Sequence, residues 1–366
     1  MRRRRPAWRR LCHVWWHVSA LLLAVPAAAQ EVAAPAPGSV ADLPGWAEED
    51  AAAALAPFLG TCRALAARDP AAPLGGAGTL AGRAGRAADW ALTCAEAAAL
   101  PPGAERAFLE RRFAPVPLGT GLLTGYYEPV LSGRLAPDAA HPVPLRGSPP
   151  PPPEGARLPD RAAIEAGALD GLAPTLAYVD PVEAFFLQIQ GSGRVVLPDG
   201  GLLRLLYAGK NGHPYRAIGR VLIERGEIPR EAMSMQAIRA WLAAAPPDRA
   251  AALLRENPSY VFFRRDEALR PDEGPPGTLG VPLAPGRSLA VDPAQVPLGA
   301  PVWIVTRDPL DGRPIRQLVH AQDTGGAIRG PARGDLFWGW GEAAAERAGP
   351  MREPVEMTVL LPLPAP

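Results

Sequence analysis

Apolar residues recur at helical spacing in the first third of the chain. The segments 55–65 and 90–97 each place apolar side chains three or four positions apart, on either side of a glycine-rich break. A third such segment, 104–116, stops at a proline and leads into GLLTGYYEPVLSG at 121–133, which is typical of extended chain. The pattern predicts three helices followed by a strand.

The middle of the chain combines period-two alternation with turn signals. AFFLQIQ at 184–190 alternates, GSG and PDGG interrupt, and RVVL and LLRLLYAG continue the pattern. We therefore expect a β-meander here. Helical periodicity then returns three times, with Ser234 as a candidate N-cap. These helices are expected within 213–226, 234–244 and 251–257.

Strand and turn patterns resume after the Pro/Gly break GPPGTLG. Four apolar segments follow, separated by PLG, DGRP and glycine-rich loops, at 288–292, 300–307, 316–323 and 354–362. Many short strands without an alternating parallel β–α–β pattern favour barrels over a doubly wound sheet. The predicted fold class is mainly β with α segments.

The first residues have the pattern of an export signal. Residues 1–29 run from a basic start through a short apolar stretch to small residues, with cleavage expected after Ala29. Gln30 and not a cysteine follows, which argues against a lipid anchor. Residues 30–45 predict a flexible leader. We expect an exported, periplasmic protein that is soluble after cleavage; outer-membrane association and the Sec or twin-arginine route stay open.

Charge and cysteine content narrow the picture further. Losing a signal with six arginines and no acids changes the formal charge from +1 to −5, so we expect no nucleic-acid partner. Cys62 and Cys94 remain in a compartment that permits oxidation. We favour a disulfide between them, with two separately buried thiols as the alternative.

Three aspartates stand beside predicted strand ends in the C-terminal region. Asp323, in AQDTGGAIRG, is followed by a threonine and two glycines, which let backbone approach a ligand and can leave a carboxyl facing a groove. Asp335, in RGDLFWGWGEA, could cap a helix or raise the proton affinity of Asp323 by like-charge repulsion. Asp292 precedes a proline and is expected to cap a turn. Asp323 is the candidate acid.

Other chemistries have little support in the sequence. His213 and His320 are isolated and the aspartates lack oxygen-ligand spacing, so we expect no metal and give neither histidine a catalytic role. No GxSxG motif or serine–histidine–acid order appears, and the mature cysteines lack a catalytic setting. We therefore expect no covalent acyl chemistry and no cofactor.

Aromatic and amide side chains suited to sugars occur near predicted turns. Thr124, Tyr126, Gln190 and Ser192 are candidates to line a groove, where rings stack on sugars and amides bind hydroxyls. The run Phe185–Phe186 fits ordinary barrel core better.

Several long segments together resemble one family. TGYYEPVLSGR, LQIQGSGRV, YAGKNGHPYRAIGRVLIERGEIP, MSMQAIRAWL, NPSYVFF and the aspartate segments are similar to the membrane-bound lytic murein transglycosylase A (MltA) family, in the same order from about residue 124 to residue 362.

The resemblance implies a fold of two domains with a substrate groove between them. A double-psi β-barrel, with a three-aspartate (3D) region, would comprise 46–128 and 263–366, and a second β-barrel would be inserted at 129–262. The family's catalytic aspartate falls on Asp323 and its downstream acid on Asp335. Its substrate-binding segments cover the following residues of this chain: Thr124, Tyr126, Gln190, Gly191, Ser192 and Lys210.

The implied activity is non-hydrolytic cleavage of peptidoglycan glycan strands. Asp323 would protonate the β-1,4 bond between N-acetylmuramic acid and N-acetylglucosamine, and the muramic C6 hydroxyl would attack C1 to give a 1,6-anhydro end. A hydrolase of the same bond and a non-catalytic peptidoglycan-binding protein are the alternatives. We expect a monomer; whether cutting is exo or endo, and which proteins recruit it, stay open.

Overall fold

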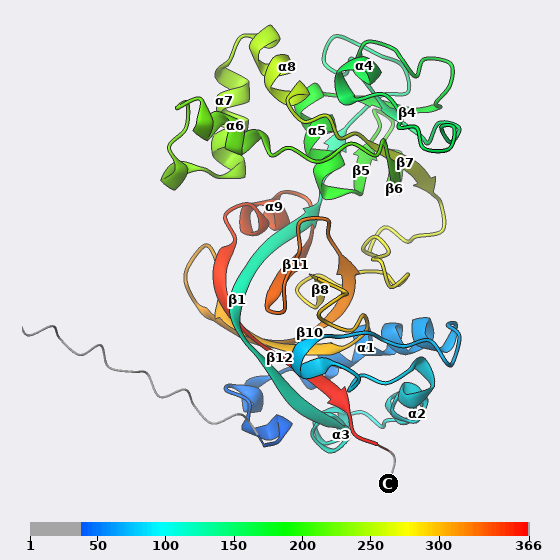
Figure 1. The fold of residues 1–366 in the computed structure, drawn as a ribbon, viewed down its shortest axis with the longest axis vertical. Coiled ribbons are helices and arrows are strands. Elements are labelled where there is room, and N and C mark those ends of the chain that lie inside the picture. The colour runs from blue at the N-terminus through cyan, green and yellow to red at the C-terminus, as the bar shows by residue number, and fades with distance from the viewer. Residues whose placement is uncertain (1–37, 365–366) are drawn as a thin grey trace, which may run out of the picture. The chain divides into compact units, whose positions relative to one another are not determined.

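The computed structural model describes residues 38–364. The predicted signal peptide and residues 30–37 of the predicted leader lie outside the described residues. Figure 1 shows the helices and strands. The helices are α1 (Ala51–Ala66), α2 (Ala91–Ala98), α3 (Glu105–Arg112), α4 (Arg161–Glu165), α5 (Pro181–Gln190), α6 (Ile218–Glu224), α7 (Met235–Ala244), α8 (Pro247–Arg255) and α9 (Glu342–Ala348). The strands are β1 (Phe113–Glu128), β2 (Val130–Ser132), β3 (Val143–Arg146), β4 (Thr175–Val179), β5 (Gly193–Val196), β6 (Leu202–Lys210), β7 (Val261–Asp266), β8 (Ser288–Val291), β9 (Pro301–Arg307), β10 (Pro314–Thr324), β11 (Arg333–Trp340) and β12 (Arg352–Pro362).

Six strands from the two ends of the described chain close into one barrel. Their order is β1-β11-β8-β10-β9-β12. The long strand β1 pairs antiparallel with β12 along 113–124 and parallel with β11 along 122–128. β1 therefore pairs with both β11 and β12, and Figure 1 shows its long course along the barrel. The mainly β fold class is confirmed.

The N-terminal helices cover part of the barrel as expected. The Asp50 carboxylate accepts from the Ala53 N–H and caps α1, whose alanine-rich sequence has high helix propensity. Phe58 on α1 is fully buried among the aromatic rings of the barrel core. Cys62 on α1 and Cys94 on α2 are joined by a disulfide with Cα atoms 5.4 Å apart, which ties the two helices together.

The ordered core begins earlier than the predicted leader allowed. Val40 lies in a short 3₁₀ helix and is fully buried, and Leu43 is 3% exposed. Trp46 then packs edge-on against Trp303 of β9, with ring centroids 5.3 Å apart. Val40 and Leu43 thus belong to the barrel core, because their side chains find a surface that local composition could not reveal.

The inserted region forms a second ring of strands. One sheet has the order β2-β5-β6-β7, and β3 pairs with β4. Two isolated bridges, Arg134 with Tyr178 and Gly147 with Phe263, link the strand ends of these sheets and close the circuit. Their shared core includes Leu187, Val195 and Phe263.

The segment AFFLQIQ is helical, so its assignment to a strand was wrong. Asp180 accepts from the N–H groups of residues 182 and 183, Pro181 stands at the first helical position, and Gly191 ends α5 in the left-handed region with φ 84°. Over only seven residues, the apolar positions fit both the strand period and the helix period. The capping residues on either side therefore decided that the segment is a helix. Phe185 and Phe186 are buried, as predicted.

The three predicted helices after the meander are present as α6, α7 and α8. The Ser234 hydroxyl accepts from the Ala237 N–H at 3.1 Å, which confirms the predicted N-cap. These helices pack on the buried Phe185 and Phe186 rings of α5. Among the described residues, none of the helices is long and apolar enough to cross a bilayer.

Candidate active site

Two aspartates and a threonine share one row across the barrel wall. Ala290 of β8 pairs with Asp323 of β10 on one side and with Asp335 of β11 on the other. Thr124 of β1 continues the row because it pairs with Asp335. Directly paired side chains stand on the same face of a sheet. Strands lie about 4.8 Å apart, so the two aspartate Cα atoms are roughly 10 Å apart with only an alanine methyl between them.

This row faces away from the barrel core. Leu123 precedes Thr124, Leu289 precedes Ala290, and Leu336 follows Asp335. All three leucines belong to the buried core cluster. Successive side chains of a strand point to opposite faces. The carboxyls therefore stand on the outer face of the barrel, where both residues are half-buried.

A register shift in the strand pairing and the anchored side chain of Gln322 set the orientation of Asp323. The ladder with β8 shifts register just before Asp323. Gln322 is fully buried; it donates to Pro57 O at 2.8 Å and accepts from the Ser288 hydroxyl at 2.7 Å. A Cβ at Gly277 would lie 2.5 Å from the Gln322 carbonyl oxygen and 3.2 Å from the Asp323 Cβ, so only glycine lets that loop pass so closely.

Three donors hold the Asp323 carboxylate. The Thr278 N–H and hydroxyl lie 2.9 and 3.0 Å from Oδ1, and the Tyr126 hydroxyl lies 2.9 Å from Oδ2. Thr324 Oγ1 lies 2.8 Å from Thr278 Oγ1. Burial and then the charge of Asp323 raise the pKa of Tyr126 well above its usual value, so its hydroxyl stays protonated.

Asp335 has a different environment. It accepts from the Thr124 hydroxyl at 2.6 Å, and that hydroxyl in turn accepts from Arg333 at 2.8 Å. Burial raises the pKa of Asp335 to about 6, against the lowering effects of Thr124 and Arg333, and the charge of Asp323 raises it further. The charge of Asp323 therefore acts on Asp335 across Ala290.

The other candidate residues lie on the inserted region. Gln190 Oε1 accepts from the Tyr127 N–H at 3.2 Å, which places the end of α5 against β1. Gly191 and Ser192 follow in the same turn and are half-buried. Lys210 is exposed at the end of β6. It lies five residues beyond Leu205, the partner of Gly193, and therefore about 17 Å along the strand from this turn.

The remaining candidates have structural roles. Asp292 accepts from the N–H groups of Ala294 and Gly330, so it caps a turn as expected. His320 is fully buried and donates through Nε2 to Ala54 O at 2.8 Å; burial lowers its pKa to about 4. His213 contacts Leu158 O at 2.9 Å through Nε2.

Family models match both parts of the chain. The MltA specific insert domain matches residues 122–264, and the 3D domain matches residues 287–361. The crystal structure of the membrane-bound lytic murein transglycosylase from Agrobacterium tumefaciens is 33% identical, covers 88% of this chain and 96% of its own, and has a TM-score of 0.76. The chain belongs to the MltA family.

Two further relatives define the extent of the likeness. The MltA protein named membrane-bound lytic murein transglycosylase A from Escherichia coli K12 is 39% identical over 240 residues. The matched region covers 63% of this chain and 63% of that relative, so it spans less than two thirds of the curated protein. The structure of E. coli MltA with bound chitohexaose is 37% identical, covers 68% of this chain and 73% of its own, and has a TM-score of 0.60.

Sequence reasoning missed Thr278, which supplies two of the three donors to the candidate acid of this MltA-family chain. It lies in GPPGTLG, where the glycines and prolines indicated only a break. Its proximity to Asp323, 45 positions away, depends on the loop crossing the strand end. No local pattern could have signalled that contact.

A buried ion cluster at the start of the MltA insert was also missed. Glu128 is fully buried and accepts from Arg194 Nε at 2.7 Å and from Arg204 Nη2 at 3.3 Å. The Arg194 guanidinium also stacks 4.1 Å from the centroid of Trp340, at the end of β11. The cluster thus joins β1 and β11 of the barrel to β5 and β6 of the insert.

Sequence reasoning also missed a hydrogen-bonded serine, histidine and aspartate in one corner of the insert. Ser132, His141 and Asp138 form a hydrogen-bonded chain with two contacts of 2.8 Å. The order along the sequence is serine, aspartate, histidine within ten residues. No motif marks it, because the three meet through a loop that folds back onto β2.

Proposed function

We propose that this protein is a lytic transglycosylase of peptidoglycan. It would cleave the β-1,4 bond between N-acetylmuramic acid and N-acetylglucosamine without water and leave a 1,6-anhydromuramic end. Membership of the MltA family supports the activity, and the E. coli MltA structure with bound chitohexaose supports a glycan as the ligand. The observation that carries the proposal is the carboxyl of Asp323, held on the outer face of the barrel by Tyr126 and Thr278.

Asp323 would act as the acid through one particular oxygen. Oδ1 faces the Thr278 N–H, which can only donate, so this oxygen is the acceptor. Oδ2 faces the Tyr126 hydroxyl, which can turn to accept when the carboxyl carries a proton. The proton given to the glycosidic oxygen would therefore leave from Oδ2, and Tyr126 would stabilise the carboxylate that forms.

The same carboxylate would then serve as the base. Once the glycosidic bond breaks, Asp323 would take the proton of the muramic C6 hydroxyl while its oxygen attacks C1 of the same sugar. The nucleophile belongs to the substrate, so a second carboxyl that activates water is not required, in contrast to ordinary glycosidases. Asp335, which pairs with Ala290 beside Asp323, would influence the reaction through its charge.

The remaining polar candidates would line a groove between the barrel and the insert. Tyr126 and Thr124 lie on β1, and Gln190 and Ser192 lie at the end of α5, which contacts β1 through Tyr127. Tyr126 also packs against the fully buried Phe337, with ring centroids 5.3 Å apart, which fixes the tyrosine ring beside the carboxyl. The amide of Gln190 would bind sugar hydroxyls.

An exported, periplasmic location fits this substrate. The disulfide between Cys62 and Cys94 supports an oxidising compartment. The pattern at 1–29 supports export, and the relatives are named membrane-bound.

Digestion of purified sacculi in isotopically labelled water tests the proposal. Unlabelled anhydromuramic ends are expected; labelled reducing ends would show a hydrolase, and binding without release of soluble fragments would show a non-catalytic protein. Asp323→Asn should abolish fragment release and keep the fold. Asp311→Asn, at an exposed turn, is the matched control and should keep full activity.

A further inference from the structure

A complete proton-transfer chain lies on the insert, apart from the carboxyls of the barrel. Asp138 Oδ1 lies 2.8 Å from His141 Nδ1, and His141 Nε2 lies 2.8 Å from Ser132 Oγ. An ionised aspartate only accepts, so Nδ1 carries the imidazole proton and Nε2 is left to accept from the serine hydroxyl. This is the tautomer in which a histidine can act as general base on a serine.

The three side chains differ in exposure. Ser132 is exposed at the end of β2, the His141 side chain is 11% exposed, and the Asp138 side chain is 45% exposed. Asp138 is fixed by the backbone N–H groups of residues 140 and 141 and by Arg134, whose Nε lies 3.4 Å from Oδ2. The hydrogen bond from His141 lowers the pKa of Asp138, so its carboxylate stays charged and orients the ring.

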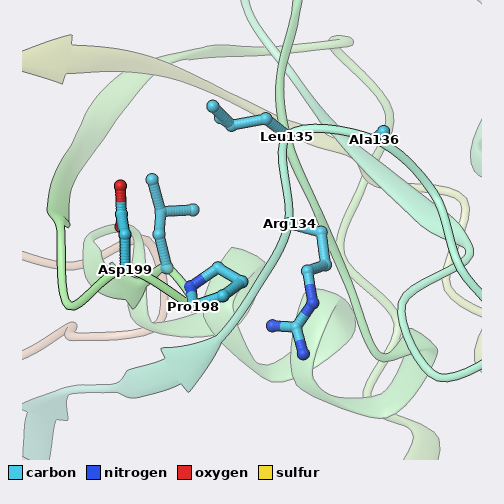
Figure 2. Close-up of a pocket in the computed structure, with 6 residues that line it drawn as sticks. Arg134, Leu135, Ala136, Pro198 and Asp199 are labelled. Carbon is cyan, nitrogen blue, oxygen red and sulfur yellow. The ribbon is translucent and has the colours of Figure 1, made fainter.

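A pocket of about 300 Å³ opens beside this chain. Figure 2 shows Arg134 and Leu135 on one side of it and Pro198 and Asp199 on the other. Ser132 is two residues before Arg134 on one wall. The residue paired with Ser132 in the β2–β5 ladder is Val196, which is two residues before Pro198 on the other wall of the pocket. The nucleophile and the pocket are therefore adjacent along both walls.

The surface around Ser132 is apolar. Val196 directly beside it, Leu202 on the next strand and Leu135 at the pocket are 37%, 39% and 63% exposed. The pocket walls add Ala136 and Pro198, with Arg134 and Asp199 at the margin. Such a site suits a short apolar acyl group attached to a polar alcohol.

We propose that Ser132, His141 and Asp138 form a second catalytic site, which hydrolyses short-chain acyl esters. In the first step the Ser132 oxygen bonds to the acyl carbon, its proton passes to His141 Nε2, and the ester C–O bond breaks as the alcohol leaves with that proton. In the second step His141 takes a proton from water, the hydroxide attacks the acyl carbon, and the acid leaves as the proton returns to Ser132. Atoms and charge balance without another reactant.

The proposed donor for the developing oxyanion is the backbone N–H of Ser132. Only alternate residues of a parallel strand bond to a given neighbour, and the Gly133 N–H donates to Val196 O of β5. The N–H of Ser132 therefore points to the opposite edge of β2. A backbone N–H of the nucleophile itself is a position from which an acyl oxygen can be stabilised.

A simpler role for the same contacts is to hold the loop from Gly133 to Pro142 against β2. That role needs the hydrogen bonds but gives Ser132 no reactivity. The two readings separate by chemistry: a loop clamp leaves ester hydrolysis unchanged when the serine is removed, whereas a nucleophile does not.

The test is hydrolysis of p-nitrophenyl acetate by the mature full-length protein, with no peptidoglycan present, so it is independent of the proposed lyase reaction. Ser132→Ala should lower the protein-dependent rate at least about 100-fold, and Asp138→Asn at least about tenfold. Ser148→Ala and His213→Gln are the matched controls, an exposed serine and a histidine that each contact a backbone carbonyl, and should keep the wild-type rate.

A second measurement identifies the nucleophile directly. A fluorophosphonate ester should attach to Ser132 with loss of fluoride, and peptide mass spectrometry should locate the adduct there in the wild type and not in His141→Gln. Release of glycan fragments from sacculi should be unchanged in Ser132→Ala. The proposal is overturned if the wild type shows no ester turnover above buffer, if Ser132→Ala matches the wild-type rate, or if the label settles elsewhere.

Discussion

Replacing Asp335 by asparagine should change how stability depends on pH. Burial raises the pKa of Asp335 from 3.8 to about 6 in the folded protein. Between these values the folded state keeps a proton that the unfolded state has already released. Stability falls with rising pH wherever the folded state binds more protons, so this carboxyl costs stability progressively as pH rises through the window.

The expected magnitude follows from the size of the shift. The pKa changes by about 2, and each unit corresponds to 1.36 kcal/mol, so the free energy of unfolding should lose about 3 kcal/mol across the window. Asparagine does not ionise. The difference in unfolding free energy, wild type minus Asp335→Asn, should therefore fall by about 3 kcal/mol between about pH 4 and pH 7.

The wild type alone would hide this effect because His320 acts in the opposite sense. Burial lowers the pKa of His320 from 6.5 to about 4, so the unfolded state binds the extra proton in that window and stability rises with pH. The shift again corresponds to about 3 kcal/mol. Subtracting each variant from the wild type removes the contribution that both proteins share.

Urea unfolding followed by circular dichroism at a series of pH values measures both slopes. The wild type minus Asp335→Asn difference should fall with pH, and the wild type minus His320→Gln difference should rise, which provides an internal control of the sign. A flat or rising difference for Asp335→Asn would show that Asp335 is ionised throughout the window, and the reasoning from its burial would be refuted.

Three further changes test other parts of the structure. Tyr126→Phe removes a donor to Asp323 worth about 1.5–3 kcal/mol, so release of fragments from sacculi should fall about 10- to 100-fold with little loss of stability; an unchanged rate would exclude Tyr126 from the mechanism. Glu128→Ala leaves buried arginines without their partner and should cost about 3–5 kcal/mol in urea unfolding; a loss below about 1 kcal/mol would contradict the buried cluster. The double substitution Cys62→Ser with Cys94→Ser opens a loop of 32 residues and should lower the free energy of unfolding by about 3–4 kcal/mol relative to the oxidised wild type, measured by thermal unfolding. The reduced wild type is the control and should be as unstable as the double variant.

Local chemistry was enough to predict many elements. The helices at the N-terminus and the strands of the C-terminal region follow from apolar spacing, and Ser234 caps its helix as its side chain requires. The segment at 184–190 failed the same reasoning. Seven residues satisfy both periods, and the decisive signals, Asp180 with Pro181 before and Gly191 after, lie outside the alternating run.

The candidate site could be predicted only in part. Asp323 stands out locally because it ends a strand before two glycines, whereas the donors around it come from distant segments. Tyr126 is 197 positions away and Thr278 is 45 positions away. Pattern reasoning identifies which residues carry useful groups, but it does not identify their neighbours.

The sequence by itself determined the mainly β class, the helix caps and the aspartate available as an acid, because these depend on spacing and on side chains a few residues apart. Only the tertiary structure decided that Asp323 and Asp335 flank Ala290, that Glu128 is buried between two arginines, and that Ser132 meets His141. The physical reason is register: strand pairing fixes which distant side chains share a face, and burial then sets their charge.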